Sequence, residues 1–322
     1  MQKYLDCICC GTKNREIIST TGRNFTKLKT VICTGCGLIH SDPIPTKDEL
    51  KNFYEKDYRL NYKSVPEPLI KHTLRYAKDS LEYLIEILGF GNFENINQKN
   101  FLDIGAGSGE ILYFAKKLGF NIKGIEPNKG YALFCKNKLH LDVINSVYEE
   151  TFIELNNYDV INLNQVLEHM PDPLDVLIDL KKFLREGGIL ALTVPNIEAN
   201  LHSPQTRFHY AHIFNYNHLN LKKLFDKAGY KILNPETNET RIYAKKVKNP
   251  NNQKINFDFN ANYKKIDRIL KSNNTFKHYG SSMPYKRFLK KCFQYPKEII
   301  LSLIYNSHKK ILDKTYNSFL KN

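Results

Sequence analysis

The chain has 322 residues, of which 42% are apolar, enough for one substantial domain with a packed core and for smaller ones. Its apolar runs are far shorter than the ~20 residues that span a bilayer, and the start MQKYLDCICC is no charged-then-apolar signal, so we expect a cytosolic protein. In a reducing compartment, the seven cysteines are expected as metal ligands or free thiols rather than disulfides.

The net charge of +15 is unevenly distributed along the chain. Residues 245–322 hold 18 Lys/Arg and 4 Asp/Glu, and the preceding residues hold 30 and 29. A neutral body argues against an enzyme built around nucleic acid, whereas the basic tail suits an anionic partner. We therefore expect no nucleic-acid partner and consider peripheral contact of the tail with the inner membrane face. A solvated tail without a partner is the alternative.

Two cysteine pairs lie near the start, each followed by a glycine that lets the backbone turn around a metal. Their spacing, C-x-x-C-G repeated after 22 residues, suits a tetrahedral structural zinc site in a ribbon over residues 1–45. The ligands are Cys7, Cys10, Cys33 and Cys36. Cys9 is interpreted as a bystander. A redox pair and an RNA-gripping ribbon are weaker alternatives, the latter because few basic residues flank the cysteines.

Residues 46–95 are predicted to form a helical linker or lid. Thr46 and Glu49 form a capping-box pattern at the start of a helix over Lys47–Tyr54. A long amphipathic helix is expected over Leu69–Leu88. The tyrosines between these helices either line a lid or pack on the linker; they are Tyr54, Tyr58 and Tyr62.

The stretch Phe101–Glu110, FLDIGAGSGE, is an apolar strand followed by a tight turn with glycines at alternate positions. Glycine is used where the backbone takes positive φ or where a ligand approaches closely. A helix over Ile111–Leu118 and a strand over Asn121–Ile125 follow, and the strand ends in Glu126. This order predicts a nucleotide-type βαβ unit in which Glu126 is placed to accept both hydroxyls of a ribose.

A dinucleotide fingerprint requires G-x-G-x-x-G, but Glu110 occupies the third position and would repel a pyrophosphate. The spacing G-x-G-x-G after Asp103 instead resembles motif I of the class I S-adenosylmethionine (SAM) methyltransferases. The resemblance implies a doubly wound, seven-stranded Rossmann-like α/β sheet over residues 96–246, with SAM as cofactor. Because SAM carries no phosphate, an acidic residue at this position is tolerable.

The elements expected after Glu126 alternate between helix and strand. The expected helices are Lys129–Lys138, Asp175–Leu184 and Tyr216–Lys227, the last capped by Asn215. The expected strands are Leu141–Ile144, Tyr158–Leu163 and Ile189–Val194, followed by an antiparallel pair of Tyr230–Leu233 and Thr240–Lys245.

The resemblance also implies which residues contact the cofactor. Asp103 would order the glycine loop or reach the amino group of SAM, and Ser146 or a backbone amide would take the place of an adenine-contacting aspartate that this chain lacks. Asn164 and Gln165 lie at the carboxyl end of a strand, where ligands bind in such sheets. The full set is Asp103, Gly105, Ala106, Gly107, Gly109, Glu126, Pro127, Ser146, Asn164 and Gln165.

Three histidines are candidate general bases for a neutral acceptor hydroxyl. His209 and His212 belong to an irregular segment, Ile197–Phe214, which also holds His202. His169 lies in the motif VLEHMPDP and either acts as a base or pins its loop by hydrogen bonds.

Residues 1 to about 246 resemble the zinc-ribbon-bearing methyltransferases, a group that includes enzymes methylating sugars of surface polysaccharides and antibiotics. Sugar C-methyltransferases of this kind carry a large C-terminal α/β domain, whereas residues 247–322 suggest a linker, Asn249–Asn262, and basic helices over Tyr263–Lys271 and Tyr285–Leu320. We therefore expect O-methylation of a sugar, nucleotide sugar or glycan. A non-catalytic scaffold and a methyltransferase acting on RNA or another small molecule are the alternatives, and the oligomeric state stays open.

Overall fold

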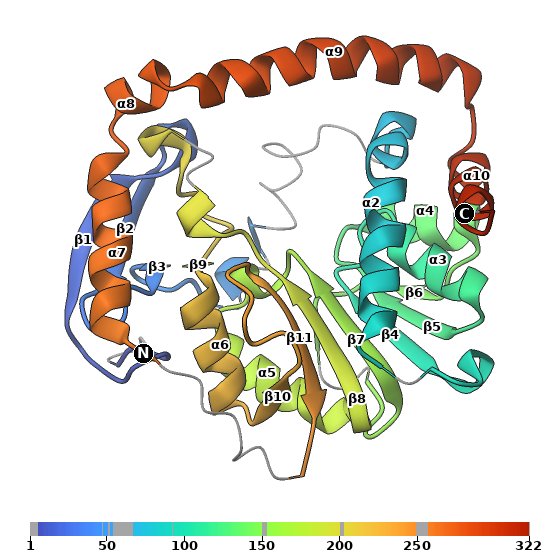
Figure 1. Cartoon of the computed structure of the whole chain (residues 1–322), viewed down its shortest axis with the longest axis horizontal. Helices are drawn as coiled ribbons and strands as arrows, with labels where there is room; N and C mark the ends of the chain where they lie inside the picture. Colours follow the sequence, from blue (N-terminus) through green and yellow to red (C-terminus); the bar gives the residue numbers. More distant parts are fainter. Residues whose placement is uncertain are drawn as a thin grey trace. The chain divides into compact units, whose positions relative to one another are not determined.

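The computed structural model (Figure 1) describes most of the chain, in segments separated by short gaps. The described residues are 6–46, 48–50, 52–53, 67–91, 93–149, 153–199, 203–248 and 257–321. The predicted tyrosines of the lid, Tyr54, Tyr58 and Tyr62, and also His202, lie outside them.

The chain divides into two compact units, each of which is described by itself. The ribbon unit comprises Met1–Leu50, Gln165–Lys181 and Leu192–Phe288. The glycine-loop unit comprises Lys51–Asn164, Lys182–Ala191 and Leu289–Asn322.

The predicted seven-stranded α/β sheet is present, with the strand order β10-β11-β8-β7-β4-β5-β6. In the glycine-loop unit, β4 (Asn100–Ile104) runs parallel to β5 (Asn121–Ile125) on one side and to β7 (Tyr158–Asn164) on the other. The order of the strands therefore reverses at β4. In such sheets, ligands bind at this switch point, at the carboxyl ends of the strands. The short strand β6 (Val143–Ile144) extends the sheet beside β5.

The prediction for the strand that follows α5 (Pro173–Phe183) was wrong at its start. We expected residues 185–188 to end the helix and the strand to begin at Ile189. Instead β8 (Leu184–Thr193) follows the helix directly, and Gly187 within it has a φ of +76°, a conformation that favours glycine. The expected antiparallel pair at the sheet edge is confirmed as β10 (Tyr230–Ile232) and β11 (Arg241–Lys246).

Four helices of the glycine-loop unit pack beside the strands that carry the loop. Helix α2 (Ile70–Gly89) lies against α3 (Glu110–Leu118), as its amphipathic pattern predicts, and α4 (Lys129–Leu139) follows β5. Helix α10 (His308–Phe319) contacts α2, α3 and α4, and the Tyr113 hydroxyl of α3 donates to Asp313 of α10 at 2.6 Å. The end of the chain therefore packs onto the first turns after the glycine loop.

The ribbon unit contains an antiparallel sheet of four strands in the order β1-β2-β3-β9. Strands β1 (Arg15–Thr21), β2 (Lys27–Cys33) and β3 (Ile39–Ser41) belong to the ribbon. The fourth, β9 (Phe214–Asn215), comes from the segment that we expected to be irregular, and Asn215 pairs with Ile39.

Because Asn215 is in β9, it does not cap the next helix, so that prediction was wrong. Helix α6 (His218–Lys227) is capped by Asn217, whose side-chain oxygen accepts from the Asn220 amide at 3.1 Å. The capping box at the start of the linker is confirmed, since Thr46 and Glu49 exchange hydrogen bonds of 2.8 and 3.2 Å.

The C-terminal residues form more helix than expected. Helix α7 (Phe259–Ser272) begins inside the predicted linker and buries Ile266 against Leu28 and Ile32 of β2. The predicted helix over Tyr285–Leu320 is two helices, α9 (Ser282–Ile304) and α10, and a short helix α8 (Thr275–Gly280) precedes them.

Candidate active site and metal centre

The glycine turn after β4 has the backbone that its sequence predicts. Gly105, Gly107 and Gly109 have φ angles of +77°, +56° and +82°, a region that residues with a Cβ rarely adopt. The turn is tied to the next strand, because the Gly105 and Ala106 amides donate to the Ile125 carbonyl at 2.8 and 3.0 Å. A ligand at this turn would meet backbone without intervening side chains.

The Glu126 carboxylate lies against this turn, at the end of β5. It is buried, and its Oε2 and Oε1 accept hydrogen bonds from the Gly107 and Asn128 amides, both at 2.8 Å. The Asn145 side chain donates to the carbonyls of Glu126 and of Pro127, both at 3.0 Å. Glu126 is therefore held in place by backbone groups. Since a carboxylate oxygen accepts two hydrogen bonds, the geometry is compatible with a ribose contact, which stays a prediction.

Among the described residues, Asp103 is hydrogen-bonded to the neighbouring strand β7, and its predicted role toward the glycine loop or the cofactor stays a prediction. Its Oδ1 accepts from the Asn162 side chain of β7 at 2.7 Å, and the Tyr83 hydroxyl of α2 donates to Asn162 Oδ1 at 3.0 Å. Burial raises the pKa of Asp103 to about 7, with smaller contributions from the negative charges of Glu126 and Glu110, and the Asn162 hydrogen bond opposes the rise. Sequence reasoning missed Tyr83 and Asn162. The polar Asn162 in the apolar strand YDVINL was the available signal.

A third buried carboxylate, Glu110, stands at the first residue of α3. The Ser108 hydroxyl lies 2.9 and 2.7 Å from its two oxygens, and the Thr73 hydroxyl of α2 donates at 3.2 Å. Three carboxylates thus line the turn, those of Asp103, Glu110 and Glu126. Such a site disfavours a phosphate and favours a ligand with positive charge.

The remaining predicted cofactor residues lie at strand ends. Asn164 is the exposed last residue of β7, and Gln165 follows it at a φ of +59°, unusual for a residue with a side chain. The Gln165 amide donates to the Thr193 carbonyl at 2.8 Å. Pro127 is exposed, and Ser146 is half-buried two residues after β6. Their roles toward a cofactor stay predictions.

The ribbon unit brings the three predicted histidines together, and two of them, His169 and His212, lie beside one carboxyl group. The ring centroids of His209 and His212 are 3.8 Å apart, and those of His169 and His212 are 5.0 Å apart. Glu168 Oε1 lies 3.8 Å from His169 Nε2 and 4.0 Å from His212 Nε2. Glu168 was not among the predicted site residues, although it adjoins His169 in the motif LEHMPDP.

Burial controls the protonation of this cluster. Glu168 is 1% exposed, and within the described parts of the chain neither of its oxygens has a hydrogen-bond partner. Burial raises the pKa of Glu168 to about 8 and lowers that of His169 to about 4. His169 Nδ1 lies 2.6 Å from the Ala211 carbonyl, which only accepts, so Nδ1 carries the hydrogen. At neutral pH the cluster therefore holds a neutral carboxyl group and a neutral His169, and this histidine also ties its loop to Ala211.

Glu168, His169 and His212 are residue types that bind divalent metals, and their ligand atoms lie within 4.8 Å of one another. The carboxylate–imidazole separations of 3.8 and 4.0 Å exceed the ~3.4 Å between ligand atoms on a tetrahedral zinc with bonds of ~2.0–2.1 Å. The arrangement thus fits a proton-transfer cluster better than a closed zinc site.

The four predicted metal ligands do converge. Cys7 Sγ lies 3.6 Å from Cys36 Sγ, and Cys10 Sγ lies 3.5 Å from Cys33 Sγ. Zn–S bonds of ~2.3 Å place tetrahedral sulfurs ~3.8 Å apart, so the four thiols fit zinc. The glycines after the pairs have positive φ, as expected, with Gly11 and Gly37 at +80° and +77°.

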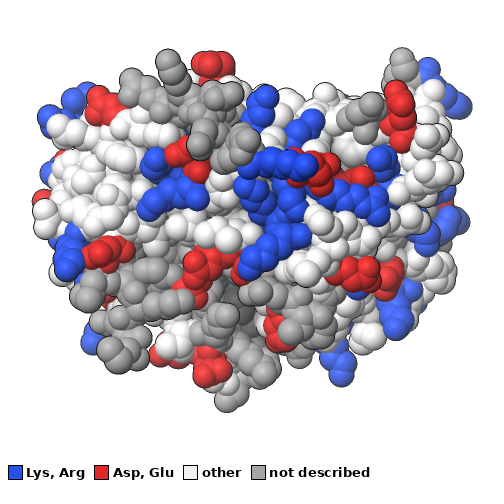
Figure 2. Space-filling view, turned by 90° about the horizontal axis from the view of Figure 1, so that it is seen from below, with Lys and Arg blue, Asp and Glu red and all other residues white. Residues whose placement is uncertain are grey.

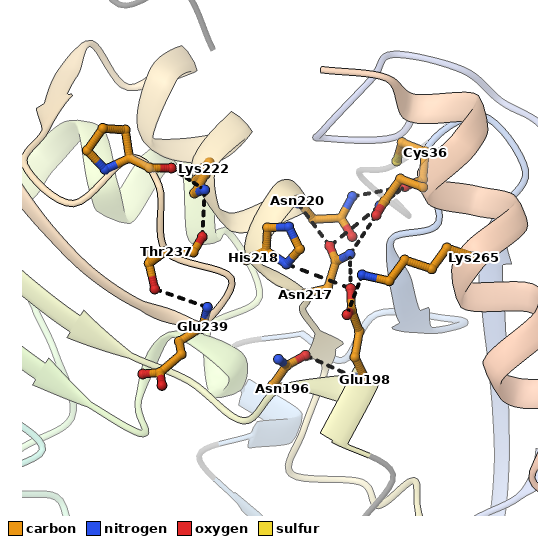
Figure 3. A network of polar contacts seen from close by, with 12 residues as sticks. Cys36, Asn196, Glu198, Asn217, His218, Asn220, Lys222, Thr237, Glu239 and Lys265 are labelled. Atoms are coloured by element: carbon orange, nitrogen blue, oxygen red, sulfur yellow. Dashed lines mark hydrogen bonds and ion pairs between the residues drawn. The ribbon is translucent and has the colours of Figure 1, made fainter. Parts of the chain in front are cut away.

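Two helices far along the chain, α6 and α7, contact the second cysteine pair of the metal centre (Figure 3). The Cys36 carbonyl accepts from the side chains of Asn220 in α6, at 3.0 Å, and Asn262 in α7, at 2.8 Å. Asn217 connects them further, donating to Asn262 at 2.6 Å and to Glu198 at 2.7 Å. The buried Cys9 is not one of the four cysteines whose ligand atoms lie within 4.8 Å of one another, and its Sγ lies 3.6 Å from the Asn220 side-chain nitrogen.

The family described as "Methyltransferase domain" matches residues 70–234, which is half of the chain. The chain belongs to this methyltransferase family. The matched region contains the glycine turn, Glu126 and the cluster around Glu168. The family assignment confirms the methyltransferase domain and the Rossmann-like fold that the sequence predicts.

Curated relatives of this chain carry the name "Ubiquinone biosynthesis O-methyltransferase". The protein from Rickettsia typhi is 28% identical over 160 residues, covering 47% of this chain and 61% of the relative. The protein from Hydrogenovibrio crunogenus is 27% identical over 103 residues, covering 30% of this chain and 42% of the relative. The chain spans about half the length of the curated relatives it matches.

Among solved structures, a SAM-dependent methyltransferase from Archaeoglobus fulgidus is 18% identical, with a TM-score of 0.38. The alignment covers 49% of this chain and 69% of that protein. The names of the curated relatives do not support the narrower resemblance to sugar and polysaccharide methyltransferases.

Proposed function

We propose that the chain is a SAM-dependent methyltransferase that transfers the methyl group to a hydroxyl oxygen. The observation that carries the proposal is the Glu126 carboxylate held 2.8 Å from the amide of Gly107, at the rim of a glycine turn of the methyltransferase family. The charge of the turn supports SAM over a nucleotide phosphate, because three carboxylates would face the positively charged sulfonium and ammonium groups of SAM.

The acceptor is proposed as a sugar, nucleotide sugar or glycan. A second candidate is an acceptor of ubiquinone biosynthesis, which the names of the curated relatives favour. Both candidates agree on oxygen as the methylated atom.

SAM, when bound, supplies a methyl group already activated by the positive charge of its sulfur. The acceptor oxygen would form a bond to the methyl carbon while the C–S bond breaks, and the bonding electrons would go to sulfur. The protein must therefore align the acceptor and remove its proton. His212 is our first choice for the base with His209 beside it, because Nδ1 of His169 is occupied by the Ala211 carbonyl. Glu168 Oε1 lies 4.0 Å from His212 Nε2, and once the Glu168 carboxyl group ionises, at its raised pKa of about 8, it would stabilise the resulting imidazolium.

The four cysteines would hold zinc in a structural role. Four thiolates fill a tetrahedral ion, so no position would be left for a substrate. The zinc would fix the ribbon onto α6 and α7 through the Cys36 carbonyl.

Calorimetric titration with S-adenosylhomocysteine tests the cofactor. We expect micromolar binding by the wild type, loss of binding by Glu126→Ala, and unchanged binding by the control Glu149→Ala, an exposed acidic residue. Absence of binding by the zinc-loaded wild type would overturn the proposal and favour the scaffold alternative. Radiolabelled methyl transfer to nucleotide sugars, glycans and ubiquinone precursors would then distinguish the acceptors.

A further inference from the structure

Helix α9 (Figure 1) carries large apolar side chains that are exposed to solvent. Seven exposed large apolar residues of α9 fall within ~160° of the helix circumference at 100° per residue, and so lie on one face. Phe293 is 79% exposed and Ile304 66%. The residues of this apolar face are Tyr285, Phe288, Leu289, Phe293, Ile299, Ile300 and Ile304.

The opposite face of α9 is fixed to the protein. Glu298 is buried and forms a two-pronged ion pair with Arg75 of α2, at 2.8 and 2.6 Å, and Gln294 also donates to it at 2.6 Å. At 100° per residue, Leu289 lies 180° around the helix from Glu298, and Ile300 lies 200° around it. The ion pair therefore turns the apolar face outward.

The charge of α9 is strongly basic around this face. The helix holds five Lys/Arg against the single acid Glu298, which is paired with Arg75. The basic residues are Lys286, Arg287, Lys290, Lys291 and Lys297. On the face seen in Figure 2, Lys and Arg side chains gather near the centre of the view, with Asp and Glu side chains at the edges of this group.

We propose that α9 binds the interface of an anionic lipid bilayer, with its apolar face among the acyl chains and its Lys/Arg side chains at the headgroups. An amphipathic helix with aromatic and aliphatic residues on one face and basic residues beside them has the composition of such interfacial helices. None of the helices in the described residues is long and apolar enough to cross a membrane, so the contact is peripheral.

The charge of the helix favours a membrane over a second copy of this chain. Face-to-face pairing of two α9 helices would bring two sets of five cations together and destabilise the pair. Anionic headgroups instead neutralise those cations while the acyl region covers the apolar side chains. This proposal rests on α9 and does not depend on the reaction that the protein catalyses.

Co-sedimentation of the full chain with vesicles tests the proposal. We expect binding to vesicles of equal parts phosphatidylglycerol and phosphatidylcholine, weaker binding as salt is added, and little binding to phosphatidylcholine alone. Phe293→Glu should lower the bound fraction at least ~5-fold, because a carboxylate would enter the acyl region. The matched control is Leu155→Glu, at a 69% exposed leucine outside α9, which should bind like the wild type.

Lys290→Ala/Lys291→Ala provides a second variant that leaves the apolar face intact, and it should lower binding only to the anionic vesicles. Equal binding by Phe293→Glu and the wild type would overturn the proposal. The proposal would also be overturned if the wild type failed to bind vesicles and formed a dimer that Phe293→Glu dissociates. The apolar face of α9 would then be a self-association surface.

Discussion

Glu126 Oε2 accepts a hydrogen bond from the Gly107 amide at 2.8 Å, which joins the tip of β5 to the turn that leaves β4. The positive φ of Gly107 is part of the turn that presents this amide to the carboxylate. A carboxylate that is both buried and hydrogen-bonded to backbone keeps its position before any ligand arrives. The turn and the acid therefore act as one preorganised unit, and changes to either should affect both stability and ligand binding.

The glycines of the turn should differ in their tolerance of a methyl group. A Cβ at Gly109 would lie 2.8 Å from both Cys135 Sγ and Leu141 Cδ1, whereas a Cβ at Gly107 would meet only the Gly105 carbonyl oxygen at 3.9 Å. We expect Gly107→Ala to cost ~1 kcal/mol, mainly for its backbone, and Gly109→Ala ~2–4 kcal/mol because overpacking adds to it. Urea unfolding measures both. Cys135→Ala should recover part of the Gly109→Ala loss, and equal losses in the two single variants would contradict this argument.

The raised pKa of Asp103 predicts a pH dependence of stability. Because the folded-state pKa, about 7, lies above the value of an exposed aspartate, the folded protein binds a proton more tightly than the unfolded chain does. The stabilisation is fully present below pH ~4 and is lost as the pH rises through ~7. In thermal melts, the difference in Tm between Asp103→Asn and the wild type should therefore move in favour of the variant from pH 5 to pH 8. A difference independent of pH would show that Asp103 does not titrate in this range.

Removal of the metal should unfold the ribbon, and we expect the glycine turn to keep its structure. We expect about one zinc per chain in the wild type, loss of that zinc in Cys36→Ser, and retention in Cys9→Ser, whose thiol lies beside Asn220. Elemental analysis gives the metal content. A strong chelator should lower the Tm of the wild type and Cys9→Ser alike, and loss of zinc from Cys9→Ser would make Cys9 a ligand.

The sequence predicts the βαβ core closely because its signals are local. The glycine spacing and the apolar runs place β5 at Asn121–Ile125 without error, and the amphipathic pattern places α2 within one residue. The C-terminal break between α9 and α10 was missed, although Ser307, at the start of α10, provides a cap whose hydroxyl accepts from the Lys310 amide at 3.5 Å.

Features that depend on partners distant in the sequence could not be predicted in this way. Strand β9 has only two residues and exists because Asn215 and Phe214 pair with β3. The same pairing moves the helix cap from Asn215 to Asn217, two asparagines that local sequence does not distinguish. Asn162 and Glu168 were missed as site residues because their importance lies in what burial and neighbouring segments do to them.

The histidine cluster yields a prediction that separates a base from a structural residue. His212→Asn should lower kcat for methyl transfer by ~10²–10⁴-fold while leaving the affinity for S-adenosylhomocysteine unchanged, because the base acts on the acceptor and not on the cofactor. Glu168→Gln should remove the pH dependence of kcat near pH 8, where the Glu168 carboxyl group ionises. His169→Asn serves as the comparison. Because it disturbs the hydrogen bond to Ala211, it should lower Tm while leaving kcat close to the wild-type value. If kcat of His212→Asn were nearly that of the wild type and depended on pH in the same way, His212 would be excluded as the base. His209→Asn would then be the next variant to measure.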